Sequence, residues 1–182
     1  MPSVFLSPST QEFNPYVDGG NEEYYMNLIA DAMIPYLMAS GITVARNNPE
    51  ESLRQAINLS NSGNYDLHLA LHSNAAPPNL AGQLRGTDVY YYASSQPSAA
   101  AANIIADNFK KVYPNPALVK TVGTTSLAEL RMTRSPAVLI EIAYHDNPQD
   151  AQWIRDNIDA IARNLAMSVA EILKVPFREP TA

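Results

Sequence analysis

The sequence predicts an α/β fold: a single three-layer domain with a mostly parallel or mixed sheet and helices on both faces. Short apolar runs of strand length alternate with helical patterns along the chain, as in strand–helix–strand units. The 182 residues suit one substantial core, and a hydrophobic fraction of 46% is that of a folded globule. No internal repeat or second domain is visible. We therefore expect one domain over residues 1–175, with a tail or linker stub over 176–182.

The first 40 residues predict a strand, a loop and a helix. Residues 3–7 are short, apolar and closed by Pro8, which suits a strand, and a polar loop follows over 9–21. Asn21 suits the N-cap of a helix over about 22–39, whose acidic first turn matches the helix dipole. Pro35 implies a kink or an early end of that helix.

The remaining elements follow from the same patterns. Gly41 ends the first helix, and the expected elements after it are a strand over 42–45, a helix over 50–60 with Leu53, Ala56 and Ile57 inward, strands over 65–71 and 86–92, a helix over 98–112, a loop through Pro114 and Pro116, a short segment over 126–131, a strand over 137–142 and a helix over 151–174.

Composition excludes several classes of function. The net charge is -6, and no run of Lys or Arg is present, which argues against a nucleic-acid groove. The absence of Cys excludes thiol catalysis and zinc–thiolate sites, and leaves any metal to His, carboxylate and amide ligands. No apolar stretch approaches the roughly 20 residues of a membrane span, and no signal peptide is visible. A cytoplasmic protein, a domain cut from a longer precursor and a protein released by lysis all stay open.

His72 is the first candidate for a functional residue. It follows the apolar run over 65–71 and precedes a polar loop, so it lies at the carboxyl end of a predicted strand, where ligand-binding residues of α/β sheets collect. His68 would lie roughly 13 Å away along the same strand, so the two cannot share an ion. We interpret His68 as a hydrogen-bonded core histidine and His145 as a loop residue.

Glu141 is the second candidate, because it interrupts the most apolar strand of the chain. Side chains alternate along a strand, so Ala137, Leu139 and Glu141 share one face. A carboxylate near the end of a buried strand costs several kcal/mol unless it is paired, neutralised or bound to a metal. Two interpretations stay open: an ion pair with Arg131 or Arg134, and a catalytic acid or base whose pKa burial raises toward neutrality.

Four blocks of sequence together form a recognisable pattern. The blocks are Asn21-Glu22 leading a helix with Met26 and Ala30 on one face; Leu53-Arg54-Gln55-Ala56-Ile57-Asn58; Leu71-His72-Ser73-Asn74-Ala75 with the later stretch 86–91; and Pro136-Ala137-Val138-Leu139-Ile140-Glu141-Ile142, continuing over 146–150. With these blocks, in this order, the chain resembles the zinc-dependent N-acetylmuramoyl-L-alanine amidases of the cell-wall-hydrolase type (amidase family 3), over about residues 3–175.

The resemblance implies a zinc site. His72 would be a zinc ligand, Glu141 the catalytic glutamate, and Glu22, at the start of the first helix, the second ligand, with Glu23 as a one-residue-slip alternative. The bond cut would join the muramic acid lactyl group to the L-Ala of the stem peptide. The resemblance also implies that the protein binds peptidoglycan and is a monomer. It would act in the cell wall or the extracellular space, as an autolysin or a phage-type endolysin does.

The chain departs from the family at one ligand. The family has a histidine just after the first strand, in an Asp-Pro-Gly-His-Gly-Gly-like loop, whereas residues 7–11 here read Ser-Pro-Ser-Thr-Gln. Thr10 aligns with the missing histidine, and Gln11 is the nearest residue with a side-chain carbonyl that can reach the metal. An amide oxygen is a poorer zinc ligand than imidazole. Completion by Gln11, a role for Thr10, a substituting water and a different metal stay open.

Two rival functions are weighed against the amidase. A metal-poor, inactive peptidoglycan-binding relative is favoured by the lost histidine. An unrelated hydrolase or nucleotide binder is disfavoured, because the chain has neither a Gly-x-Ser-x-Gly nucleophile elbow nor a glycine-rich phosphate loop. The loops over 73–85 and 112–125 are expected to contact glycan and peptide.

Overall fold

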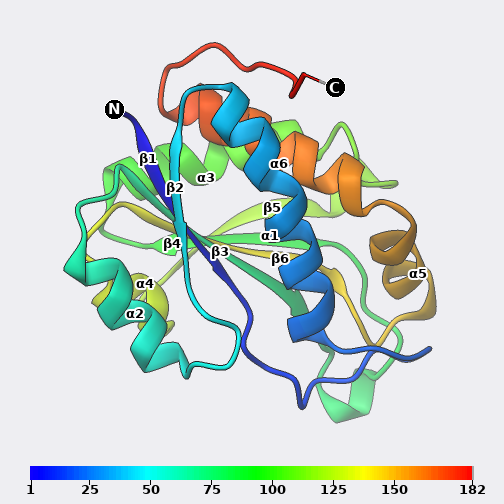
Figure 1. Cartoon of the computed structure of the whole chain (residues 1–182). Helices are drawn as coiled ribbons and strands as arrows, with labels where there is room; N and C mark the ends of the chain where they lie inside the picture. Colours follow the sequence, from blue (N-terminus) through cyan, green and yellow to red (C-terminus); the bar gives the residue numbers. More distant parts are fainter. Residues whose placement is uncertain (182) are drawn as a thin grey trace.

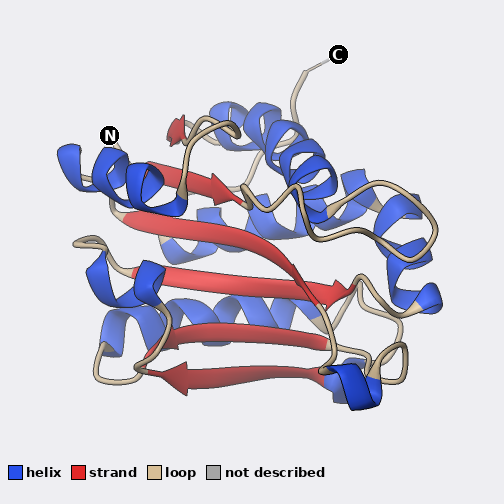
Figure 2. Cartoon of the chain, turned by 90° about the horizontal axis from the view of Figure 1, so that it is seen from below, coloured by secondary structure: helices blue, strands red, loops and turns tan. Residues whose placement is uncertain are grey.

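The computed structural model describes residues 1–181, which form one six-stranded mixed sheet between helices (Figures 1 and 2). The strand order is β2-β1-β3-β6-β4-β5. All neighbours pair in parallel except β4 and β6, which are antiparallel. The strands are β1 (Ser3–Pro8), β2 (Thr43–Arg46), β3 (Leu67–Asn74), β4 (Thr87–Tyr92), β5 (Val119–Thr124) and β6 (Ala137–Tyr144).

Helices cover both faces of the sheet. On one face, Val138 and Ile140 pack in a large apolar cluster with α1, α3, α5 and α6. On the other face, Leu139 packs in a smaller cluster with Leu130 of α4, and α2 lies beside α4 (Figure 1). The predicted α/β class and three-layer single domain are confirmed. The helices are α1 (Glu22–Ala39), α2 (Leu53–Ser62), α3 (Gln96–Phe109), α4 (Ala128–Met132), α5 (Pro148–Asp156) and α6 (Ile158–Ile172), with short 3-10 turns at Pro78–Leu80 and Pro116–Leu118.

The predicted helix over 151–174 is two helices. The chain breaks at Asn157, whose side chain donates to the carbonyl of Trp153 at 2.8 Å and whose backbone N–H donates to the carbonyl of Ile154. Such hydrogen bonds of an asparagine compete with the backbone hydrogen bonds of a helix. The helix α5 therefore ends at Asp156, and α6 begins at Ile158 in a new direction. The periodic pattern alone contains no sign of this local competition.

Three further expectations are corrected. Residues 119–124, expected in a loop, form β5, an edge strand that pairs only with β4 among the described strands. Pro35 does not end α1 early, because its ring lies on the exposed side of the helix and α1 continues to Ala39. Leu53, expected inward, is 40% exposed at the first position of α2.

The segment after α6 lies against α1 and α6. The ring of Phe177 stacks near that of Tyr36, with 6.0 Å between centroids, and the backbone N–H of Arg178 donates to Ser40 Oγ. The division of the chain near residue 175 stays a prediction. Within residues 1–181, no helix combines the length and apolarity that a membrane crossing requires.

Candidate active site

His72 and Glu141 are direct neighbours at one edge of the sheet. Because β3 and β6 run in parallel, their carboxyl ends meet, and the register pairs His72 with Glu141. The strand β3 extends to Asn74, so His72 lies inside the strand rather than just after it, which corrects its expected position. In each strand the polar residue directly follows a buried apolar residue, Leu71 in β3 and Ile140 in β6, and the register pairs these two apolar residues as well.

Glu22 reaches this edge from the first position of α1. Asn21 caps the helix by accepting the N–H of Tyr24 at 2.8 Å, which fixes the helix start. The Glu22 side chain is buried, and its Oε1 lies 2.9 Å from Nδ1 of His72. Glu23 instead accepts a hydrogen bond from Asn27. The structure thus brings Glu22, not Glu23, to His72; its role as a ligand stays a prediction.

Gln11 reaches the cluster through another amide, that of Asn14. The side-chain nitrogen of Asn14 donates to Oε1 of Gln11 at 3.0 Å and to Oε2 of Glu22 at 2.7 Å. Within residues 1–181, no hydrogen bond joins Gln11 directly to Glu22 or His72. Asn14 was not expected from the sequence, since a single asparagine in a polar loop carries no distinguishing signal.

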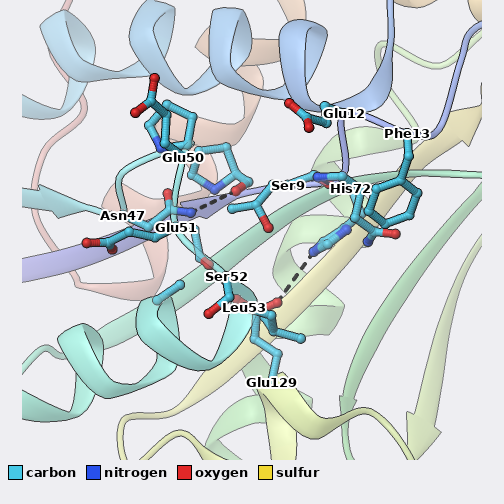
Figure 3. Close-up of a pocket in the computed structure, with 16 residues that line it drawn as sticks. Ser9, Glu12, Phe13, Asn47, Glu50, Glu51, Ser52, Leu53, His72 and Glu129 are labelled. Atoms are coloured by element: carbon cyan, nitrogen blue, oxygen red, sulfur yellow. Dashed lines mark hydrogen bonds and ion pairs between the residues drawn. The ribbon is translucent and has the colours of Figure 1, made fainter.

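Glu129 is the main residue that sequence reasoning missed. It projects from the short helix α4, is only 2% exposed, and its Oε2 lies 3.4 Å from Nε2 of His72 (Figure 3). Its Oε1 accepts hydrogen bonds from Ser7 Oγ and, at 3.0 Å, from Nε2 of His68. A carboxylate next to Leu130 in a short segment resembles any surface residue, so only the fold identifies it as buried.

The other two histidines lie as predicted. His68 is fully buried; since the carboxylate of Glu129 can only accept, Nε2 of His68 carries the proton, and Nδ1 accepts from Ser60 Oγ at 2.9 Å. This confirms a hydrogen-bonded core histidine. His145 lies in the turn after β6, and its Nδ1 is 3.0 Å from Ser73 Oγ. Within residues 1–181, no hydrogen bond joins His145 to His72, Glu22 or Glu129.

Glu141 is not held by an ion pair. Within residues 1–181, neither Arg131 nor Arg134 pairs with it, and its buried Oε2 has no hydrogen-bond partner. Burial raises the pKa of Glu141 to about 7; the charge of His72 opposes this shift, and the carboxylates of Glu22 and Asp88 add to it. The ion-pair interpretation is therefore wrong for these residues. A carboxylate with this pKa and a free oxygen is suited to accept a proton near neutral pH.

Glu141→Gln should stabilise the metal-free protein at pH 8 relative to pH 5. The folded pKa lies above the unfolded value, so the wild type loses stability as pH rises from about 4.5 through about 7, and the amide does not. The difference should reach about 2–3 kcal/mol in the free energy of unfolding, measured by urea denaturation in EDTA. The matched variant Glu12→Gln, which changes an exposed carboxylate, should follow the wild type. A pH-independent difference would contradict the raised pKa.

The contacts of His72 require a cation between its ring and Glu22. The Nε2–H of His72 donates toward Glu129, so in the neutral ring the lone pair of Nδ1 would face a carboxylate oxygen at 2.9 Å. Burial lowers the pKa of His72, but the hydrogen bonds with Glu129 and Glu22 outweigh it and raise the pKa well above its usual value. A proton can occupy this position, and so can a metal ion.

The donor chemistry fits a divalent cation at that position. An imidazole nitrogen and a carboxylate oxygen that already face one another are suitable ligands for zinc, and a carboxylate on the opposite ring nitrogen is the usual partner of a ligating histidine. Within the described residues, no three His, Asp or Glu side chains converge as a complete metal site. A third protein ligand would therefore be an oxygen of another kind, such as an amide.

A cavity of about 550 Å³ opens beside His72 (Figure 3). His72 and Glu129 line it together with the loop after β1 and the loop that precedes α2. Asn47 holds these two loops together by donating to the carbonyl of Pro8 at 3.1 Å. The cavity thus opens onto His72 and Glu129, but not onto Glu22 or Glu141, from the side of β1 and β2.

An α/β sheet that gathers an imidazole and three carboxylates at its carboxyl edge, beside a cavity, has the architecture of a hydrolase catalytic domain. The chain belongs to the N-acetylmuramoyl-L-alanine amidase family, whose sequence pattern matches residues 12–171. This confirms the resemblance inferred from the four blocks. The match begins just after residues 7–11, the end of β1 and the start of the following loop, where the family's first histidine is missing here.

Individual relatives agree with this assignment. The chain is 28% identical over 114 residues to the probable cell wall amidase LytH of Staphylococcus aureus, an alignment that covers 62% of this chain and only 35% of that protein. The chain thus spans about a third of the length of the curated relatives it matches.

Solved structures share the fold. The catalytic domain of CwlV, an N-acetylmuramoyl-L-alanine amidase from Bacillus (Paenibacillus) polymyxa var. colistinus, superposes with a TM-score of 0.82 at 20% identity, covering 97% of this chain and 100% of that one. The catalytic domain of the CD27L endolysin, which targets Clostridia difficile, gives 0.76 at 22% identity, with 94% and 98% covered.

Proposed function

We propose that the chain hydrolyses the amide bond between N-acetylmuramic acid and the L-Ala of the stem peptide in peptidoglycan. In this proposal a zinc ion is held by Nδ1 of His72 and Oε1 of Glu22, with Gln11 as a third ligand, and Glu141 is the general base. The observation that carries it is the facing pair of acceptors on His72 and Glu22, next to the unpartnered carboxylate of Glu141. Membership of the amidase family supports the choice of bond.

In the mechanism, zinc supplies Lewis acidity that activates water and polarises the scissile carbonyl. Glu141 accepts a proton from the attacking water as the oxygen adds to the lactyl carbonyl carbon. The carbon–nitrogen bond then breaks, and Glu141 passes its proton to the departing α-amine of L-Ala. The products are a lactyl carboxylic acid and a peptide with a free amino terminus. Glu129 and Asn14 keep His72 and Glu22 oriented throughout.

The decisive experiment combines metal analysis with product analysis. Protein purified without chelator should contain about one zinc per chain, and should release stem peptides with a free N-terminal L-Ala from purified peptidoglycan, detected by mass spectrometry. Loss of activity in chelator and its return with zinc should follow. A protein that holds no stoichiometric divalent metal and releases no peptides would overturn the proposal.

The second candidate is a peptidoglycan-binding relative without activity. The replacement of the family's first histidine by the Ser-Pro-Ser-Thr-Gln stretch over 7–11 favours it. Such a protein would sediment with insoluble peptidoglycan but leave every peptide attached. In either case we propose the cell wall as the place of action.

Gln11→His should tighten zinc binding by about tenfold or more, because imidazole is a better zinc ligand than an amide oxygen. Affinity is measured by competition with a chromophoric chelator. Thr10→His is the matched variant, since Thr10 aligns with the missing histidine and lines the same cavity. A gain with Gln11→His alone supports Gln11 as the third ligand; a gain with Thr10→His alone, or with neither, contradicts that role.

A further inference from the structure

Glu129 connects two histidines that no direct contact joins. Its Oε1 accepts hydrogen bonds from His68 and Ser7, and its Oε2 accepts one from His72. The carboxylate is buried and comes from α4, outside the blocks on which the family resemblance rests. Buried carboxylates are costly unless each oxygen is satisfied, so this arrangement constrains the protons of all three partners.

We propose that Glu129 is a positioning residue that keeps a proton on Nε2 of His72, so that Nδ1, which faces Glu22, is the nitrogen that can exchange its own proton for a metal ion. This rests on the proposed function only in assigning Nδ1 to a metal. A carboxylate accepts and never donates, so Nε2 of His72 must carry hydrogen to satisfy Oε2. The contact is 3.4 Å long, which leaves the ring room to adjust while Glu22 holds the other nitrogen at 2.9 Å.

The substitution Glu129→Gln reverses this constraint. The amide oxygen is expected at the position of Oε1, because two donors, Ser7 and His68, face that position and only one faces Oε2. The amide NH₂ group then faces Nε2 of His72, which must become an acceptor. The ring then keeps a proton only on Nδ1, which donates it to Glu22, and Nδ1 can bind a metal ion only if a proton is placed on Nε2 against the amide. The change keeps the size of the side chain and alters only one direction of hydrogen bonding.

The chain suits a direct test, since it has only three histidines. Nitrogen-15 NMR of the imidazole rings in metal-free protein should show hydrogen on Nε2 of His72 in the wild type and no hydrogen there in Glu129→Gln. Zinc affinity, measured with zinc chloride against a chelator, should fall about 10- to 100-fold in the variant. Ser60→Ala is the matched control: it removes the hydroxyl partner of His68 without touching Glu129, and should lower stability while leaving His72 and zinc affinity as in the wild type.

The outcomes separate this inference from the proposed function. An unprotonated Nε2 in the wild type overturns the inference, and this measurement does not depend on whether the variant folds. A Glu129→Gln protein that keeps the Nε2 proton and binds zinc within about threefold of the wild type also overturns it. A wild type that shows the expected proton but binds no zinc contradicts the proposed function and leaves the positioning role of Glu129 supported.

Discussion

Glu141→Gln should lower the rate of peptide release by about 10²- to 10⁴-fold, the usual contribution of a general base, while zinc content stays at the wild-type level. The amide keeps the shape of the side chain but cannot accept the proton of the attacking water. The unpartnered Oε2 next to His72 is the geometric reason for choosing this residue. Single-turnover release of stem peptides, read by mass spectrometry, measures the loss, and metal analysis of the same sample shows that the site is intact.

Glu179→Gln is the matched control, because Glu179 pairs with Arg163 in the segment after α6 and lies outside the cluster. Its activity should equal that of the wild type. The pH profile adds a second check: since the pKa of Glu141 is raised to about 7, activity should decline as pH falls, with its midpoint at or below that value because bound zinc favours the carboxylate. More than about a tenth of wild-type activity in Glu141→Gln would refute its role as base.

The fold was predictable because its interior strands contain apolar runs that few polar residues interrupt. In β3 and β6, buried on both faces, apolar runs of strand length have few other interpretations. The edge strand β5 was missed because a strand with one neighbour needs little apolar character, and its Lys120, Thr121 and Gly123 are typical of a loop. Its existence depends on the partner β4, which the local sequence does not contain.

The candidate site was predictable in the same uneven way. His72 and Glu141 stand out because each is a polar residue in an apolar strand, and the register then makes them neighbours. Glu129 and Asn14 are not distinguished by their neighbours in the sequence, since Glu129 lies in a short segment of mixed polar and apolar residues and Asn14 in a polar loop. Their importance comes from long-range packing of α4 and of the loop after β1, a tertiary effect that periodicity does not encode.

His72→Ala should destabilise the metal-free protein by about 3–5 kcal/mol near pH 6, because it leaves two buried carboxylates, Glu22 and Glu129, without their shared partner. Burial raises the pKa of both carboxyls, but contacts with His72, and for Glu129 also with His68, hold both below the usual value. Removing the ring removes the His72 contribution from both carboxyls, whereas Glu129 keeps its contact with His68. Urea denaturation in EDTA, followed by circular dichroism, gives the free energies of unfolding.

The pH dependence of this loss has a defined sign. Carboxyls with lowered folded pKa values stabilise the protein above about pH 4.5, and this contribution is lost as pH falls toward the folded values. His72, with a raised folded pKa, contributes below about pH 6.5 and loses that contribution only as pH rises through a much higher value. The difference between wild type and His72→Ala should therefore be largest between about pH 5 and 7, and should shrink toward pH 3.

His145→Ala is the matched variant for this experiment, because it also removes a buried histidine but one that faces the hydroxyl of Ser73. The loss should be about 1–2 kcal/mol, the usual cost of a neutral buried hydrogen bond, and should not share that maximum near pH 6. Burial lowers the pKa of His145, so its own contribution weakens on acidification below about pH 6.5. Equal losses for the two variants at pH 6 would mean that His72 is held by packing alone, and would remove the charge network from which the candidate metal site is inferred.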